Sequence, residues 1–154
     1  MNINWTTVTA IVGAALGVWN FVQGFWQRRV RLRVIPQLSV FVGTGVLSSS
    51  RDRFPPEALK ALQSNECPCI EVTNLSVFPV TIAEVGLSLL GTTSRFVIPT
   101  TVLPKRLEPR ESIDIRAESI GFPKTAKLGY ATTQCGHTCH GDSLVLKKHR
   151  ESQS

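Results

Sequence analysis

The sequence predicts a mainly β protein in which an N-terminal transmembrane α-helix is followed by an antiparallel immunoglobulin-like β-sandwich with one short helix in a loop. Three observations predict this fold. The stretch from Trp5 to Trp26 has no charged residue, the later sequence alternates apolar and polar residues, and no long amphipathic helix is present that could connect parallel strands. We expect residues 1–27 to form an anchor, residues 28–146 a β-sandwich domain and residues 147–154 a disordered basic tail.

The uncharged stretch has the length and the flanks of a single membrane span. As a helix it would be about 31 Å long, close to the ~30 Å thickness of the hydrocarbon core. Arginines follow it at once and no charge precedes it. By the positive-inside rule, the C-terminal domain should then be cytoplasmic, at the plasma (inner) membrane. Both a cleaved signal peptide and a helix lying flat on the membrane fit these flanks less well.

One face of this helix is a continuous line of small or polar side chains with an average spacing of 3.5 residues. That spacing is typical of a helix that keeps one face against a partner helix, and small side chains allow close approach. We therefore predict association with another transmembrane helix, from a second copy or another protein. The predicted association residues are Thr6, Ala10, Gly13, Gly17, Asn20, Gly24 and Gln27.

The net charge of +6 comes from the two ends of the chain, because residues 34–146 contain 10 basic and 10 acidic side chains. A neutral domain offers no basic face for phosphates, so we expect no nucleic-acid partner. The basic cluster after the helix is predicted to contact membrane lipid headgroups as well as to set the orientation. It consists of Arg28, Arg29, Arg31 and Arg33.

Short alternating runs predict about seven strands, beginning almost directly after the helix and ending at Leu144 and Leu146. The apolar parity changes between Ile82 and Val85, which predicts a bulge near Glu84. Residues 55–63 begin with two prolines and continue with good helix formers, so they predict a short helix within a long connection. Turns are predicted at Asn74 with Ser76, at Gly91, and in residues 107–111 and 121–123.

Three motifs carry a resemblance to known proteins. They are EVTNLSVFPVTIAEVG at residues 71–86, LEPRES at residues 107–112, and TQCG at residues 133–136. Together with the N-terminal apolar segment, they resemble small uncharacterised bacterial membrane-anchored proteins. The resemblance implies an immunoglobulin-like soluble domain, and it implies no catalytic residue or ligand.

Four cysteines and two histidines form the one cluster of potential metal ligands. Cys67 and Cys69 are two residues apart in a predicted strand, so both thiols should face the same side. A second group comprises Cys135, His137, Cys139 and His140. If the two segments met, they could bind zinc or form a disulfide between them. The alternative is that all four thiols are free and unconnected.

No nucleophile elbow, phosphate-binding loop or metalloprotease helix occurs in the sequence, so we expect neither an enzyme nor a small-molecule substrate. The function predicted from the sequence is a membrane-tethered, non-enzymatic interaction or accessory domain without a cofactor. The alternative is a thiol- or zinc-dependent sensor that uses the Cys67/Cys69 and Cys135/Cys139 pairs.

Overall fold

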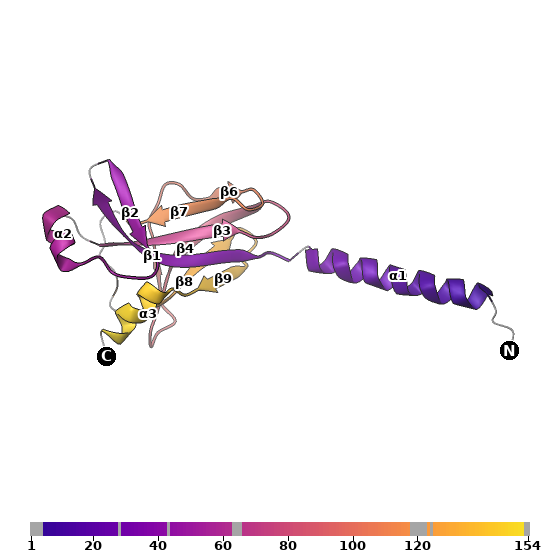
Figure 1. The fold of residues 1–154 in the computed structure, drawn as a ribbon. Coiled ribbons are helices and arrows are strands. Elements are labelled where there is room, and N and C mark those ends of the chain that lie inside the picture. The colour runs from indigo at the N-terminus through magenta and orange to yellow at the C-terminus, as the bar shows by residue number, and fades with distance from the viewer. Residues whose placement is uncertain are drawn as a thin grey trace.

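The computed structural model describes residues 5–27, 29–42, 44–62, 66–117, 123 and 125–152. Within these ranges the chain forms an N-terminal helix, two antiparallel sheets and two short helices (Figure 1). The elements are α1 (Trp5–Gln27), β1 (Leu32–Val42), β2 (Gly45–Ser49), α2 (Pro56–Leu62), β3 (Cys67–Asn74), β4 (Val80–Leu89), β5 (Arg95–Val97), β6 (Lys105–Leu107), β7 (Ser112–Arg116), β8 (Ala126–Thr133), β9 (Thr138–Gly141) and α3 (Leu144–Glu151).

Helix α1 forms where the sequence predicts a helix, but the prediction that it is a transmembrane, single-pass anchor is wrong. Among the described residues, no helix is both long enough and apolar enough to cross a membrane. The prediction relied on the lack of charge between Trp5 and Trp26, and an uncharged segment need not be apolar. Polar side chains such as Thr9, Asn20 and Gln23 lie within α1. The predicted compartment and orientation depended on this span and stay untested.

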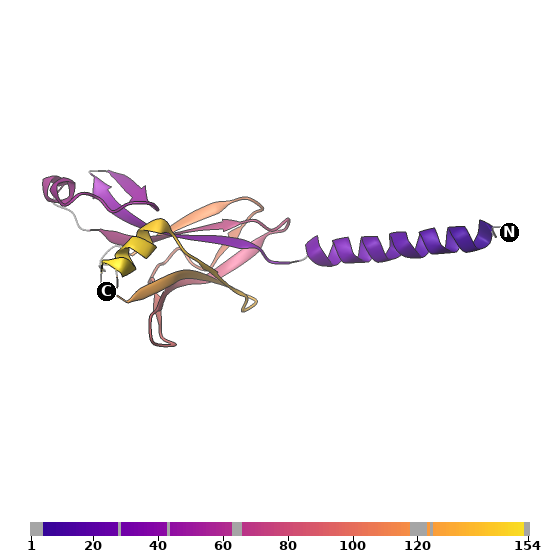
Figure 2. The same ribbon diagram turned by 60° about the horizontal axis from the view of Figure 1, so that its bottom comes forward.

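The two sheets confirm the prediction of a mainly β, antiparallel domain, and their arrangement is compatible with a β-sandwich. One sheet has the strand order β2-β1-β3-β7, and the other has β5-β4-β8-β9 with β6 paired to β4. Helix α1 extends away from one end of this domain, whereas β2, α2 and the C-terminus lie towards the other end (Figures 1 and 2).

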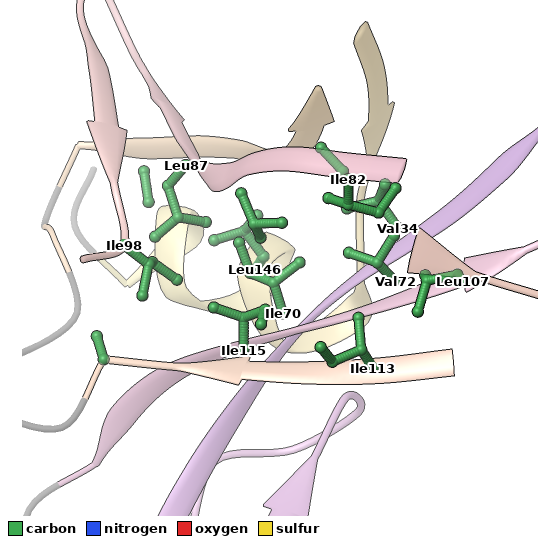
Figure 3. Close-up of a cluster of buried hydrophobic side chains, with 14 of the residues drawn as sticks. Val34, Ile70, Val72, Ile82, Leu87, Ile98, Leu107, Ile113, Ile115 and Leu146 are labelled. Carbon is green, nitrogen blue, oxygen red and sulfur yellow. The ribbon is translucent and has the colours of Figure 1, made fainter. Parts of the chain in front are cut away.

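The core lies between the two sheets. Figure 3 shows Ile82 and Leu87 of β4 on one side and Ile113 and Ile115 of β7 on the other, with Leu146 between them. Alternating apolar residues in these strands point inward, so the period-two pattern of the sequence identified much of the core correctly.

A pair of glycines allows strand β1 to cross the β8–β9 hairpin. Gly129 and Gly141 are opposite each other in that hairpin. A Cβ atom on Gly141 would lie 1.7 Å from the carbonyl oxygen of Val34, and one on Gly129 would lie 2.6 Å from Cγ of Pro36. Both distances are too short for any side chain, so the two sheets can approach this closely only with glycine at both positions.

Pro36 fits the same crossing because of its place in the hydrogen-bond pattern of β1. Leu75 N–H donates to the Arg31 carbonyl, so Arg31 and Leu75 are a hydrogen-bonded pair at the end of the β1–β3 ladder. Along antiparallel strands, such pairs alternate with pairs that exchange no hydrogen bond, and Pro36 falls in a pair of the second kind. Pro36 therefore occupies a position whose N–H would point away from β3, and β2 pairs with β1 only from Leu38 onward. Proline costs no ladder bond at that position.

The prediction of a last strand at Leu144 and Leu146 is wrong, because these residues begin helix α3. The Ser143 side chain caps the helix by accepting a hydrogen bond from Leu146 N–H at 3.3 Å. Val145 and Leu146 are fully buried. Residues 147–151, which we predicted as part of a disordered tail, belong to this helix.

Several local predictions are confirmed. The register between β4 and β8 shifts between Ile82 and Glu84, where we predicted a bulge. Helix α2 forms within the predicted segment 55–63, and β1 begins five residues after the end of α1. Gly91 adopts a positive φ of 73° in a turn. The sequence patterns missed β2, β6 and β9. The turn predicted at residues 121–123 falls almost entirely outside the described residues.

We predict that Gly141→Ala destabilises the protein by at least about 2 kcal/mol, because the added methyl group meets the backbone of β1 rather than a flexible side chain. Gly45→Ala is the matched control in a strand, since its Cβ would lie 3.5 Å from the nearest atom. Urea unfolding followed by circular dichroism measures both. Equal stability of the two variants would contradict the close crossing.

We also predict that stability falls as the pH is lowered, because of His149. Its side chain is buried, and burial lowers the pKa of the ring, an effect partly offset by the Pro123 carbonyl 3.3 Å from Nε2. The unfolded chain therefore binds a proton at a higher pH than the folded chain. The contribution of His149 to the free energy of unfolding is fully present above the pKa of histidine in the unfolded chain, about 6.5. It is lost as the pH falls from there through the lower pKa of the folded chain.

The measurement is the urea midpoint at a pH of about 7.5 and of about 5.5. His149→Gln should reduce the difference between the two midpoints, whereas His140→Gln, at an exposed position, should retain it. An unchanged difference in His149→Gln would show that another group is responsible.

Candidate interaction surface at the junction of helix α1 and the β-domain

The turn after β3 is organised by the buried side chain of Asn74. Its Oδ1 accepts a hydrogen bond from Ser76 N–H at 2.9 Å, as predicted for an asparagine turn. Its Nδ2 donates to three carbonyl oxygens, at 2.9 Å to Phe78, 3.1 Å to Leu107 and 3.3 Å to Glu108. One side chain thus connects the turn before β4 to the end of β6.

The backbone of Asn74 holds the turn between β6 and β7, which lies in the LEPRES motif. Asn74 N–H donates to the Glu111 carbonyl at 2.9 Å, and Arg110 N–H donates to the Asn74 carbonyl at 2.7 Å. Arg110 has a positive φ of 67°, which a residue other than glycine seldom adopts without such support. The predicted turn in residues 107–111 is confirmed.

The same turn fixes the start of β1 after helix α1. Arg31 N–H donates to Oγ of Ser76 at 2.8 Å, and the Arg31 carbonyl accepts from Leu75 N–H at 2.8 Å. These bonds involve only the backbone of Arg31. Its side chain is exposed and takes no part in them. The chain therefore leaves the sheet towards α1 from a fixed point.

A groove lies between the C-terminal half of α1 and this turn, and it encloses about 450 Å³. Trp19 and Val22 of α1 form one wall, and Leu75 and Val77 of the turn form part of the other. Leu75 and Val77 are 51% and 68% exposed, so the turn presents large apolar side chains to solvent. Arg29 and Arg31 also line the groove.

The small residues predicted for helix association lie along the exposed surface of α1. Thr6, Ala10, Gly13, Gly17 and Asn20 are all exposed, and Gly24 is half-buried. A Cβ atom added to Gly13, Gly17 or Gly24 would meet no atom within 4 Å. The side chain of Gln27 is outside the described residues. Association through this face stays a prediction.

The four arginines of the predicted headgroup contact follow α1, and their role stays an untested prediction. Arg29, Arg31 and Arg33 are exposed, and Arg28 lies outside the described residues. Arg29 and Arg31 are at the groove. Arg33 lies further along β1, on the side towards β9 and α3.

The two cysteine pairs are not brought together. Cys67 and Cys69 are buried in β3 of one sheet, whereas Cys135 and Cys139 are in the β8–β9 hairpin of the other. All four are free cysteines. Within the described part of the chain, no group of three or more histidine, cysteine or acidic side chains is placed to hold a metal ion. The zinc and disulfide predictions, which included His137 and His140, therefore gain no geometric support.

Burial makes the early thiols poor nucleophiles. It is the main cause that raises the pKa of Cys69 to about 11, with Asp114 and Glu71 adding to the rise and Arg116 opposing it. Burial also raises the pKa of Cys67. Because the thiolate is the reactive form, neither residue has the character of a redox or catalytic cysteine.

Sequence reasoning missed the apolar members of the groove. Neither Trp19 nor Val22 was among the predicted association residues, and the turn was predicted from Asn74 and Ser76 without regard to the apolar residues beside them. One signal was available: two large apolar residues flank Ser76 in a predicted turn, where polar residues are usual.

Comparison with protein-family models and with curated proteins found no match to this chain.

We predict that Asn74→Ala destabilises the protein by roughly 3 kcal/mol, because it leaves buried carbonyl oxygens without their donor. Asn74→Asp is the informative companion, because it retains the acceptor for Ser76 N–H and loses the donations to the carbonyl oxygens of Phe78, Leu107 and Glu108. It should therefore be destabilised comparably, whereas Ser94→Ala, in an exposed turn, should change little. Chemical unfolding checks all three. Wild-type stability in Asn74→Asp would contradict the role of the Nδ2 donor.

Proposed function

We propose that this protein is a non-enzymatic interaction protein that associates with another helix through α1, with the α1 of a second copy as the first partner to test. The observation that carries the proposal is the exposed surface of α1. Large side chains such as Trp5, Ile11 and Phe21 are 78%, 64% and 75% exposed on a helix that projects from the β-domain (Figure 2). An apolar helix surface of this kind is normally covered by a partner.

The small-residue face supports a close helix–helix contact in particular. Gly13 and Gly17 are one turn apart, and the space beside them is open. A neighbouring helix can approach the backbone there, and Asn20 lies on the same face, where it can donate or accept a hydrogen bond across the contact.

The β-domain would act as the module that α1 brings to the assembly. Its kinship with small bacterial proteins that carry an immunoglobulin-like domain is part of this proposal, and it rests on the three motifs at residues 71–86, 107–112 and 133–136. The backbone of Arg31, shortly after α1, is bonded to the turn at Asn74, which supports a role in which the domain follows the helix closely along the chain.

We predict that Gly17→Leu and Gly13→Leu each weaken association of the full chain by about 5- to 150-fold. This range corresponds to the ~1–3 kcal/mol cost of placing a large side chain in a close contact. A Cβ atom at either position meets no atom within 4 Å, and both positions are exposed, so we expect the fold to tolerate leucine there. Sedimentation equilibrium measures the association, and circular dichroism checks the helix content.

Ala15→Leu is the matched control. It adds a similar volume to an exposed position two residues from both glycines, which is about 200° around the helix. It should leave the association unchanged. A wild-type chain that remains monomeric, or equal effects of all three substitutions, would contradict association through the small-residue face.

A further inference from the structure

We propose that the groove between α1 and the turn at residues 74–77 is a binding site for a monomeric anionic amphiphile, namely a long-chain carboxylate such as a free fatty acid. This inference does not depend on the proposed helix association. Trp19 and Val22 lie on the side of α1 opposite to Gly13 and Gly17, so the groove and the association face can be occupied independently.

The shape and lining of the groove define the apolar part of the ligand. Its volume of about 450 Å³ is within the roughly 300–1,000 Å³ range of small-molecule sites. Its walls are the indole of Trp19 and the aliphatic side chains of Val22, Leu75 and Val77. These groups can cover an alkyl chain, and the polar residues Gln23 and Ser76 also line the groove.

The charges at the groove define the polar part of the ligand. Arg29 and Arg31 both line it. Among the residues that the structure describes, no acidic side chain forms an ion pair with Arg31. A guanidinium binds a carboxylate through two parallel hydrogen bonds, so Arg31 favours an anionic head over a neutral or cationic one.

The junction also makes the site rigid on one side. The backbone bonds of Arg31 to Ser76 and Leu75 hold the arginine beside the apolar residues of the turn. The backbone of Arg31 is therefore held beside the apolar wall before a ligand arrives, and its exposed side chain can reach the head group from there. Because those bonds use backbone atoms, the Arg31 side chain can be replaced without loosening the turn.

The test is a titration of the full chain with laurate below its micellar concentration, followed by isothermal calorimetry and by tryptophan fluorescence, since Trp19 lies in the groove. We expect saturable binding of one laurate per chain. Dodecyltrimethylammonium, with the same alkyl chain and a positive head, should bind at least about tenfold more weakly. Decanoate should bind more weakly than laurate, because it buries less of its chain.

Two variants assign the site. Arg31→Gln should weaken laurate binding about five- to tenfold, and Val77→Asp should abolish it by placing a carboxylate in the apolar wall. Arg106→Gln, at an exposed position in β6 that does not line the groove, is the control and should bind as the wild type does.

Absence of saturable laurate binding would overturn the proposal. Equal binding of the anionic and cationic amphiphiles, or wild-type binding by Arg31→Gln, would also overturn it, because the charge selectivity would then be absent. Binding only to vesicles of an anionic phospholipid, with none to monomeric laurate, would show that the surface recognises a bilayer instead. The laurate test is independent of the self-association test. If Gly17→Leu failed to change self-association, the laurate results would still decide this proposal.

Discussion

The hydrogen bonds of Asn74 are the constraint on which the junction between α1 and the β-domain depends. The side chain and backbone of this one buried residue connect the end of β3, the start of β4 and the turn between β6 and β7. The next two residues, Leu75 and Ser76, hold the backbone of Arg31. Without the Asn74 side chain, the carbonyl oxygens of Phe78, Leu107 and Glu108 would lose a donor, and the turn that holds the backbone of Arg31 would lose its internal support.

A second constraint is the close crossing of β1 over the β8–β9 hairpin. Gly129 and Gly141 provide the space, and the absence of an N–H on Pro36 costs no ladder bond there. The two constraints lie along one strand: Arg31 is held by the turn at Asn74, and Val34 and Pro36 are held by the hairpin. Strand β1, which follows the projecting helix along the chain, is therefore in contact with both sheets.

Much of the β-domain could be predicted from the sequence, because strands with one buried face carry a period-two pattern. The alternation at Ile113 and Ile115, the parity change near Glu84 and the asparagine turn at Asn74 all have direct local causes. The same reasoning failed at Leu144 and Leu146, whose spacing of two suggests a strand. The capping serine at 143 and the burial of Val145, Leu146 and His149 show the helical alternative, which depends on packing against the sheets.

The candidate sites were harder to predict, because they depend on which segments meet in space. Cys67 and Cys69 do lie in one strand, but the β8–β9 hairpin that carries Cys139 belongs to the other sheet. The groove joins residues 19–31 to residues 75–77, and no spacing in the sequence encodes that contact. The span prediction failed for a different reason: it counted charges and gave too little weight to the uncharged polar side chains of α1.

Native-state hydrogen exchange at the backbone amides of Arg31, Asn74, Leu75 and Arg110 tests the central claim most directly. These four N–H groups donate to the bonds that converge at the turn. The account predicts that they are protected together, with opening free energies close to that of the core strands. It would be contradicted if Arg31 and Leu75 exchanged as fast as an exposed turn such as the one at Gly91 while Asn74 and Arg110 stayed protected.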